Sequence, residues 1–385
     1  MRRYLRKTCA IWMSFVLCGA CQPNNDSVRA TPDYEVVCYC ETDETNPIEV
    51  VRMDNNRDLL LACQNGKTRD QLHAEKIAST ESQIRALLDW RLLEDKDGVL
   101  RSAVPILLEP ETQALRLTTV QVATEISTSI VPDVKSFADT LKGMGHEASA
   151  YSILFSYVLD GLVFDQFEVR KALVKRAITD ARPFWSGVLW GLFPKRPFSC
   201  GTNSMDGHDL TLKVLWSRSA RKLMGPFISD WGSVTQLFEA IGREGRVNDV
   251  RLRGLFNRYG VLDTEGRPTI PIVDEANANP IYSQAKSLAG KIAGQVLTHF
   301  DLAALQLKFR LANKEDALVI AYHELMWDLL GQLEQAGVVR RPPALAAPDQ
   351  AQASDVSSLV FLVRHAGSSN RDVAGEAPGA NRQHE

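Results

Sequence analysis

A weak internal repeat constrains the fold of this chain more than any other feature of its sequence. The first copy begins at Thr68 and reads TRDQLHAEKIASTESQIRALLDWRLLEDKDGVLRSAVPIL, and the second begins at Ser233 and reads SVTQLFEAIGREGRVNDVRLRGLFNRYGVLDTEGRPTIPIV. Each copy contains two successive stretches with the apolar spacing of a helix, then an acidic turn around Gly98 or Gly266 and a hydrophobic segment with Pro and Ile. The pattern predicts helix, helix and hairpin, twice in one chain.

Both copies resemble winged helix-turn-helix modules over about 40 residues each. The resemblance implies a mainly α (α+β) fold with two winged-helix-like modules, intervening helices and a short aromatic insert rich in loops and strands. The expected boundaries are 34–135 for the first module, 136–230 for the helical region with the insert, 231–340 for the second module with C-terminal helices, and 341–385 for a disordered tail rich in Pro, Ala and polar residues.

Several helices are expected outside the repeat. Asn313 can cap a helix that runs through KEDALVIAYHELMWDLLGQLEQ and has acidic residues in its first turn. Segments 111–130 and 281–298 follow the two modules at the same relative place, and 166–181 is also predicted to be helical. The insert around Trp185 and Trp190 is expected either to fill a core or to form a contact surface.

The first 20 residues have the pattern of an export signal. A basic start, MRRYLRK, precedes an apolar run that is too short to span a bilayer, and Gly19 and Ala20 precede Cys21. This segment resembles a bacterial lipoprotein signal. The resemblance implies cleavage after residue 20, a fatty acid such as palmitate on Cys21, a tether over 21–33 and, because Gln22 follows the cysteine, an outer-membrane location. The alternative is a buried N-terminal helix of a cytosolic protein.

Export would leave four cysteines in an oxidising compartment, where they are candidates for one or two disulfides. Cys38 and Cys40 are two residues apart and so lie on the same side of an expected strand, where one of them could meet Cys63. We expect a disulfide that involves Cys63, and its partner is left open among the remaining cysteines, which include Cys200. The spacing does not fit a zinc site, and no metal or cofactor is predicted.

One loop contains residue types that serve nucleophilic catalysis elsewhere. In SCGTNSMDGHD, Cys200 and His208 lie close in sequence beside carboxylates. Proximity in sequence does not establish the geometry of a catalytic triad, so no catalytic residue is assigned. A periplasmic hydrolase that uses Cys200 and His208 is the alternative function.

The charge pattern argues against nucleic acid as a partner. The net charge is −3, and the second helix of the second repeat has Arg251 and Arg253 without a dense basic face. A winged-helix DNA-binding regulator is the second alternative, and it requires the signal interpretation to be wrong. The expected function is a membrane-anchored envelope lipoprotein that binds other envelope proteins as a binding or assembly protein, with Trp185, Trp190, Arg251 and Arg253 as contact candidates.

Overall fold

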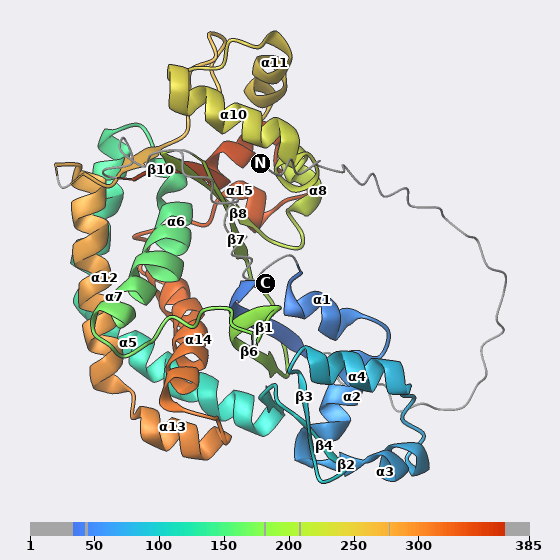
Figure 1. Ribbon diagram of the computed structural model, residues 1–385. Helices are drawn as coiled ribbons and strands as arrows, with labels where there is room; N and C mark the ends of the chain where they lie inside the picture. The colour runs from blue at the N-terminus through green and yellow to red at the C-terminus, as the bar shows by residue number, and fades with distance from the viewer. Residues whose placement is uncertain (1–33, 43–44, 181, 208, 277, 366–385) are drawn as a thin grey trace, which may run out of the picture. The chain divides into compact units, whose positions relative to one another are not determined.

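The structure is a computed structural model that describes residues 34–42, 45–180, 182–207, 209–276 and 278–365 (Figure 1). The predicted signal, tether and acylated Cys21 lie outside the described residues, as do His208 and the end of the chain from residue 366. The fold is mixed, with helices and small sheets.

The described strands form three small sheets. The first sheet has the order β1-β6-β5, with β1 (Glu35–Thr42) antiparallel and β5 (Ile106–Leu107) parallel to β6 (Trp185–Leu192). The second has the order β7-β8-β10-β9 and contains β7 (Gly201–Asp206), β8 (Leu210–Trp216), β10 (Val360–Arg364) and β9 (Ile272–Asp274). The third has the order β2-β4-β3 and contains β2 (Lys67–Thr68), β4 (Val99–Ser102) and β3 (Leu93–Lys96).

The first repeat copy has the predicted order of elements. After α1 (Pro47–Arg52) and α2 (Asn56–Ala62), strand β2 leads into α3 (Arg69–Ala74) and α4 (Glu81–Asp89), and the hairpin β3–β4 follows. Thr68 and Thr80 begin α3 and α4 with capping boxes to Gln71 and Gln83. Gly98, with φ of +81°, makes the hairpin turn.

The second repeat copy keeps the two helices but only a remnant of the hairpin. Helices α10 (Trp231–Glu244) and α11 (Val250–Arg258) are followed by a single antiparallel bridge between Leu262 and Pro268. Pro268 has no N–H to donate to a strand ladder, and the Asp263 carboxylate accepts the Arg267 N–H at 2.8 Å in a tight turn. The second hairpin therefore does not extend into two strands.

The similarity between the two copies extends beyond the modules to the pairing of the strands that precede and follow them. In each copy a short strand after the module, β5 or β9, pairs in parallel with a strand from much later in the chain, β6 or β10. The Pro105 carbonyl accepts the Gly191 N–H at 2.8 Å, and the Pro271 carbonyl accepts the Leu362 N–H at 2.9 Å. The receiving strand also pairs antiparallel with a strand that precedes the module, β1 or β8. Residues 35–192 and 201–364 therefore share one plan of strand order and pairing, to which the second range adds β7.

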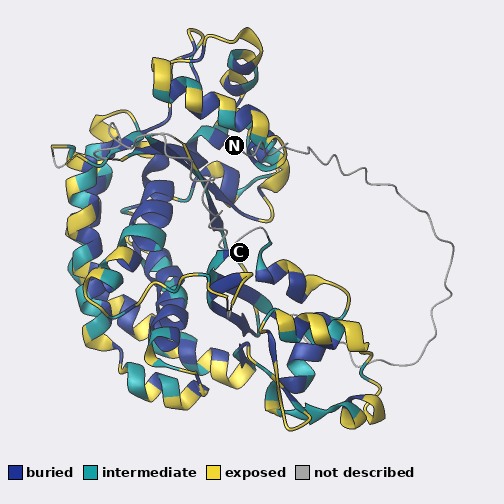
Figure 2. Ribbon diagram, in the orientation of Figure 1, coloured by how far each residue is buried: buried dark blue, intermediate teal, exposed yellow. Residues whose placement is uncertain are grey.

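The long helices pack together beside the sheets. Helix α5 (Glu109–Gly143) contacts both α12 (Pro280–His299) and α14 (Lys314–Gln335), and their buried residues lie on the sides that face one another (Figure 2). The predicted helix after Asn313 is confirmed with its cap, because the Asn313 side chain accepts the Asp316 N–H at 2.8 Å. The shorter helices are α6 (Ala150–Ile153), a π-helical segment (Leu154–Leu162), α7 (Val163–Val169), α8 (Arg221–Met224), α9 (Pro226–Ser229), α13 (Leu302–Phe309) and α15 (Pro343–Ala346).

Two expectations about secondary structure were wrong. The helix predicted over 166–181 ends at Val169, because Lys171 adopts a left-handed φ of +57° and the Ala172 N–H returns to the Phe167 carbonyl. The tail predicted to be disordered from residue 341 is ordered to residue 365 and contains α15, a 3-10 helix (Ala353–Leu359) and β10. Strand β10 lies inside its sheet between β8 and β9, which explains its continuous hydrophobic run.

Candidate binding cavity

A cavity of about 800 Å³ lies where three distant segments meet. The first segment comprises the start of β1 with α1 and α2, the second is the connection 195–200 between β6 and β7, and the third runs from the end of β8 into α8. The first and third segments belong to different copies of the repeated plan, and the connection joins the copies. The cavity is thus formed at the junction of the two copies.

The cavity wall is strongly basic. Six lining residues carry positive side chains: Arg52, Arg57, Lys195, Arg196, Arg218 and Arg221. Glu35 is the one carboxylate among the described lining residues. In a chain whose net charge is −3, these six residues concentrate basic side chains in one place.

Aromatic rings line the same cavity and pack against two of its cations. The Arg57 guanidinium lies 5.1 Å from the ring centre of Tyr34, and that of Arg221 lies 5.4 Å from the ring centre of Trp216. Phe198 also lines the cavity, and the Arg341 guanidinium lies 3.8 Å from the centre of its ring. Burial raises the pKa of the Tyr34 phenol, so this group stays neutral and adds no negative charge.

A buried ion-pair cluster fixes Arg196 in the cavity wall. Glu324 on α14, 1% exposed, accepts from Arg116 Nε at 2.7 Å and from Arg196 Nε at 3.0 Å. Arg196 Nη1 also donates to Asp328 at 2.8 Å. Burial opposes ionisation of Glu324, but His323 and the two guanidinium groups together lower its pKa to about 2. The connection 195–200 is therefore tied to α5 and α14 by charge.

Cys200 contributes a protonated thiol to the cavity wall. Burial raises the pKa of Cys200 well above its ordinary value, whereas a catalytic cysteine needs a lowered one. Ser204, a hydroxyl residue of the same stretch SCGTNSMDGHD, accepts a hydrogen bond from Lys213 at 2.8 Å within the β7–β8 hairpin. His208 lies outside the described residues, so the proposed pair of Cys200 and His208 has no described geometry.

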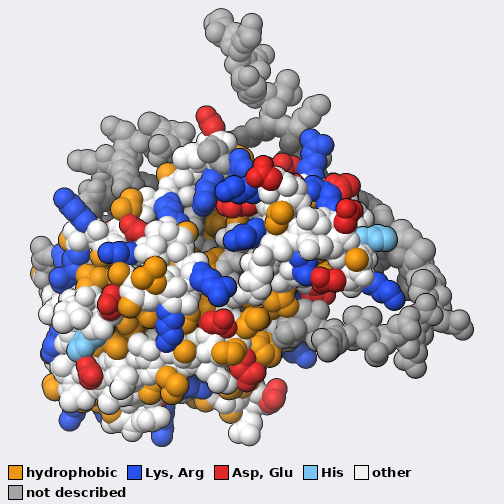
Figure 3. Space-filling view, turned by 90° about the horizontal axis from the view of Figure 1, so that it is seen from below, with side chains coloured by type: hydrophobic (Ala, Val, Ile, Leu, Met, Phe, Trp, Pro, Cys, Tyr) orange, Lys and Arg blue, Asp and Glu red, His pale blue; other side chains and the backbone are white. Residues whose placement is uncertain are grey.

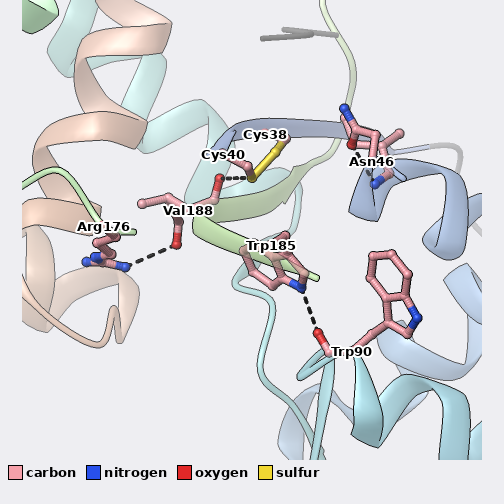
Figure 4. Close-up of a disulfide and its surroundings, with 9 residues drawn as sticks. Cys38, Cys40, Asn46, Trp90, Arg176, Trp185 and Val188 are labelled. Carbon is pink, nitrogen blue, oxygen red and sulfur yellow. Dashed lines mark hydrogen bonds between the residues drawn. A yellow bond between two sulfur atoms is a disulfide. The ribbon is translucent and has the colours of Figure 1, made fainter. Parts of the chain in front are cut away.

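The cysteine pairing differs from the expectation that Cys63 forms a disulfide. The structure joins Cys38 to Cys40, whose Cα atoms are 5.4 Å apart on one side of β1 (Figure 4). Cys63 is a free, fully buried thiol in the hydrophobic cluster beneath the first module, and burial raises its pKa to about 11. Cys200 is also free.

The two tryptophans proposed as contact residues belong to the core. Trp190 is 0% exposed and meets the His323 ring edge-on at 5.2 Å. Trp185 is buried, and its Nε1 donates to the Trp90 carbonyl at 2.7 Å (Figure 4). The insert forms strands β6, β7 and β8, so its aromatic residues fill the interior rather than a surface.

The two arginines proposed as contact residues lie outside the cavity. Arg251 is exposed and Arg253 is half-buried on α11, and neither lines the cavity. Figure 3 shows the molecule from below, away from α11 at the top of Figure 1, and on that face Lys and Arg side chains are interspersed with acidic and hydrophobic ones. That face lacks the dense basic stripe of a nucleic-acid interface.

Sequence analysis missed the cavity, although two short signals mark part of its wall. KRPFS (195–199) and WSRSAR (216–221) each place basic residues next to an aromatic one.

In the described residues no group of three or more His, Cys, Asp and Glu side chains is arranged to hold a metal ion. None of the described helices combines the length and apolar character needed to cross a bilayer. No protein-family model, curated protein or solved structure matches the chain.

Proposed function

We propose that this chain is an outer-membrane lipoprotein, acylated on Cys21, whose folded part faces the periplasm and acts by binding a ligand in the basic cavity. The proposal of a binding role is based on the cavity. Its volume of about 800 Å³ suits a small-molecule ligand, and its wall combines apolar rings with convergent charged groups. The protonated thiol of Cys200 favours binding over catalysis at this site.

The two modules serve as scaffolding in this proposal. Residues 56–102 have the element order of a winged helix-turn-helix, α2-β2-α3-α4-β3-β4, and the matching sheet order β2-β4-β3. The second module, with its reduced hairpin, is a degenerate copy. Because the modules lack a dense basic face, they are assigned to contacts with other envelope proteins rather than with DNA.

The proposal is tested by native mass spectrometry on the full chain extracted from membranes in mild detergent. The charge-reversal variant Arg218→Glu/Arg221→Glu alters two exposed residues at the cavity, and Arg251→Glu/Arg253→Glu reverses the same charge on α11 as a matched control. The native chain and the control should retain a bound component that is released on denaturation, and the cavity variant should lose it. The absence of any bound component, or its retention by the cavity variant, would contradict the proposal.

A further inference from the structure

We infer that His365 is a pH-dependent latch, which holds the end of β10 in its sheet while the imidazole is protonated and weakens when the imidazole loses its proton. Strand β10 lies between β8 and β9, and His365 is the first residue after it (Figure 1). The inference is independent of the proposed binding function. It rests on the hydrogen bonds of His365, on the charges around its ring and on the direction in which one hydroxyl group donates.

Both ring nitrogens of His365 lie at hydrogen-bonding distance from side chains of other strands or their ends. Nδ1 is 2.8 Å from Oε2 of Glu275, which directly follows β9, and Nε2 is 2.7 Å from the Thr211 hydroxyl on β8. The Thr211 hydroxyl donates in turn to Oδ1 of Asp206, at the end of β7, at 2.6 Å. The latch therefore connects the end of β10 with the other three strands of its sheet.

Protonation of His365 allows all of these hydrogen bonds to form at once. An imidazolium donates from both nitrogens, so it serves Glu275 and Thr211 while the Thr211 hydroxyl donates to Asp206. A neutral imidazole has one N–H. With that N–H on Nδ1, the Thr211 hydroxyl must turn from Asp206 to Nε2. With that N–H on Nε2, Nδ1 and the Glu275 carboxylate become two acceptors that face each other. Either way, deprotonation costs the latch one hydrogen bond.

The charged groups around the ring favour its protonated form. The hydrogen bond to Glu275 is the main cause of the raised pKa of His365, partial burial opposes it, and the charges of Glu275 and Asp206 outweigh that of Lys213 on β8. Burial opposes ionisation of Glu275, but its hydrogen bonds with His365 and with the Tyr157 hydroxyl, at 2.9 Å, lower its pKa. Burial raises the pKa of Tyr157, so the phenol stays a neutral donor.

Other contacts hold the same end of β10 alongside the latch. The Arg364 guanidinium lies 3.9 Å from the Asp209 carboxylate and 3.8 Å from that of Asp274. The His365 N–H donates to the Asp209 carbonyl at 3.1 Å, and the Glu275 N–H donates to the Arg364 carbonyl at 2.8 Å. These backbone hydrogen bonds contain no titratable group. The latch thus adds a pH-dependent contribution to an attachment that is otherwise present at every pH.

The raised pKa of His365 determines the sign of the pH effect. The folded chain binds this proton more tightly than the unfolded chain, in which an imidazole has its ordinary pKa of 6.5. The latch therefore contributes its full stabilisation below about pH 6.5 and loses it as the pH rises through the pKa of the folded chain. The end of β10 should open more readily at pH 8.5 than at pH 6.

The test is hydrogen–deuterium exchange with mass spectrometry on the purified full chain and on His365→Gln, compared at the same pH so that intrinsic exchange rates cancel. At pH 6 the peptide that contains β10 should exchange roughly three- to tenfold more slowly in the native chain, as expected for one additional hydrogen bond. The difference should shrink by pH 8.5. The control is His299→Gln, because His299 pairs with Glu125 at 2.9 Å between α12 and α5, outside the sheet, and its replacement should leave the exchange of β10 unchanged.

An NMR titration of isotope-labelled histidine rings provides a second readout, with the His365 signal assigned by its absence in His365→Gln. In the native chain His365 should titrate above pH 6.5, and in Glu275→Gln it should titrate at a lower pH. Titration of the native ring at or below pH 6.5 would overturn the latch. An exchange difference that is equally large at pH 6 and pH 8.5 would show that His365 holds β10 without acting as a switch, and this would also overturn the inference.

Discussion

Replacement of Glu324 by Gln tests the ion-pair cluster that fixes the cavity wall. Glu324 is 1% exposed and accepts hydrogen bonds from Arg116 and Arg196 at 2.7 and 3.0 Å. Gln has nearly the same shape but no charge, so both guanidinium groups would lose their shared buried partner. Breaking a buried pair in this way costs about 3–5 kcal/mol of unfolding free energy.

The effect depends on pH in a defined direction. The pKa of Glu324 is about 2 in the folded chain and 4.5 in its ordinary state, so the carboxylate binds protons more weakly when folded. Its stabilisation is therefore fully present above about pH 4.5 and is lost as the pH falls towards about 2. A shift of this size corresponds to about 3 kcal/mol, which agrees with the cost of breaking the pair.

The assay is urea unfolding of the native chain and Glu324→Gln at pH 7 and at points down to pH 3. The matched control is Glu147→Gln, because Glu147 lies 3.4 Å from Lys142 in an exposed pair and its loss should change stability by less than about 1 kcal/mol. The difference between native chain and Glu324→Gln should shrink below pH 4.5. A loss no larger than that of the control, or a difference that is constant with pH, would refute the reasoning.

Three further predictions concern the core. Gly187→Ala should lower the melting temperature, because an added Cβ would lie 2.2 Å from a backbone oxygen of β1. The control Gly331→Ala, whose added Cβ would have nothing within 4 Å, should be neutral or slightly stabilising, and equal melting temperatures of the two variants would contradict this packing. Trp190→Ala should destabilise the chain by about 3–5 kcal/mol in chemical denaturation, and a loss of binding without destabilisation would instead place Trp190 on a surface. Cys63 should resist iodoacetamide at pH 8 until the chain is unfolded, because its thiol is buried and its pKa is about 11, and rapid alkylation in the folded state would contradict its position.

The parts of the fold that were predicted correctly depend on local signals. The helix 314–335 has a cap, an acidic first turn and a long apolar face, all within its own sequence. The helices of both repeat copies have the same kind of signal, because Thr68 and Thr80 begin capping boxes in the first copy and Asp230 and Asp249 cap α10 and α11 in the second. Local hydrogen bonds and apolar spacing determine such elements, so sequence alone reveals them.

The parts that were missed depend on contacts between distant segments. Strand β10 pairs with β8 and β9, which lie far earlier in the chain, and the Pro-rich sequence before it suggested disorder. The Cys38–Cys40 disulfide was missed for a different reason: its cysteines are only two residues apart, but sequence does not determine which cysteines pair. The cavity draws its walls from three separated segments, and neither basic motif reveals that they meet.

Metabolic labelling with an alkyne-tagged palmitate, followed by separation of inner and outer membranes, tests the proposed location of this binding protein most directly. The account predicts label on the native chain in the outer membrane, no label on Cys21→Ser, and retained label on Cys18→Ser, whose changed residue leaves with the signal. An unlabelled, uncleaved native chain outside the membrane fractions would contradict the proposed lipoprotein and would make a DNA-binding assay of the two modules the next experiment.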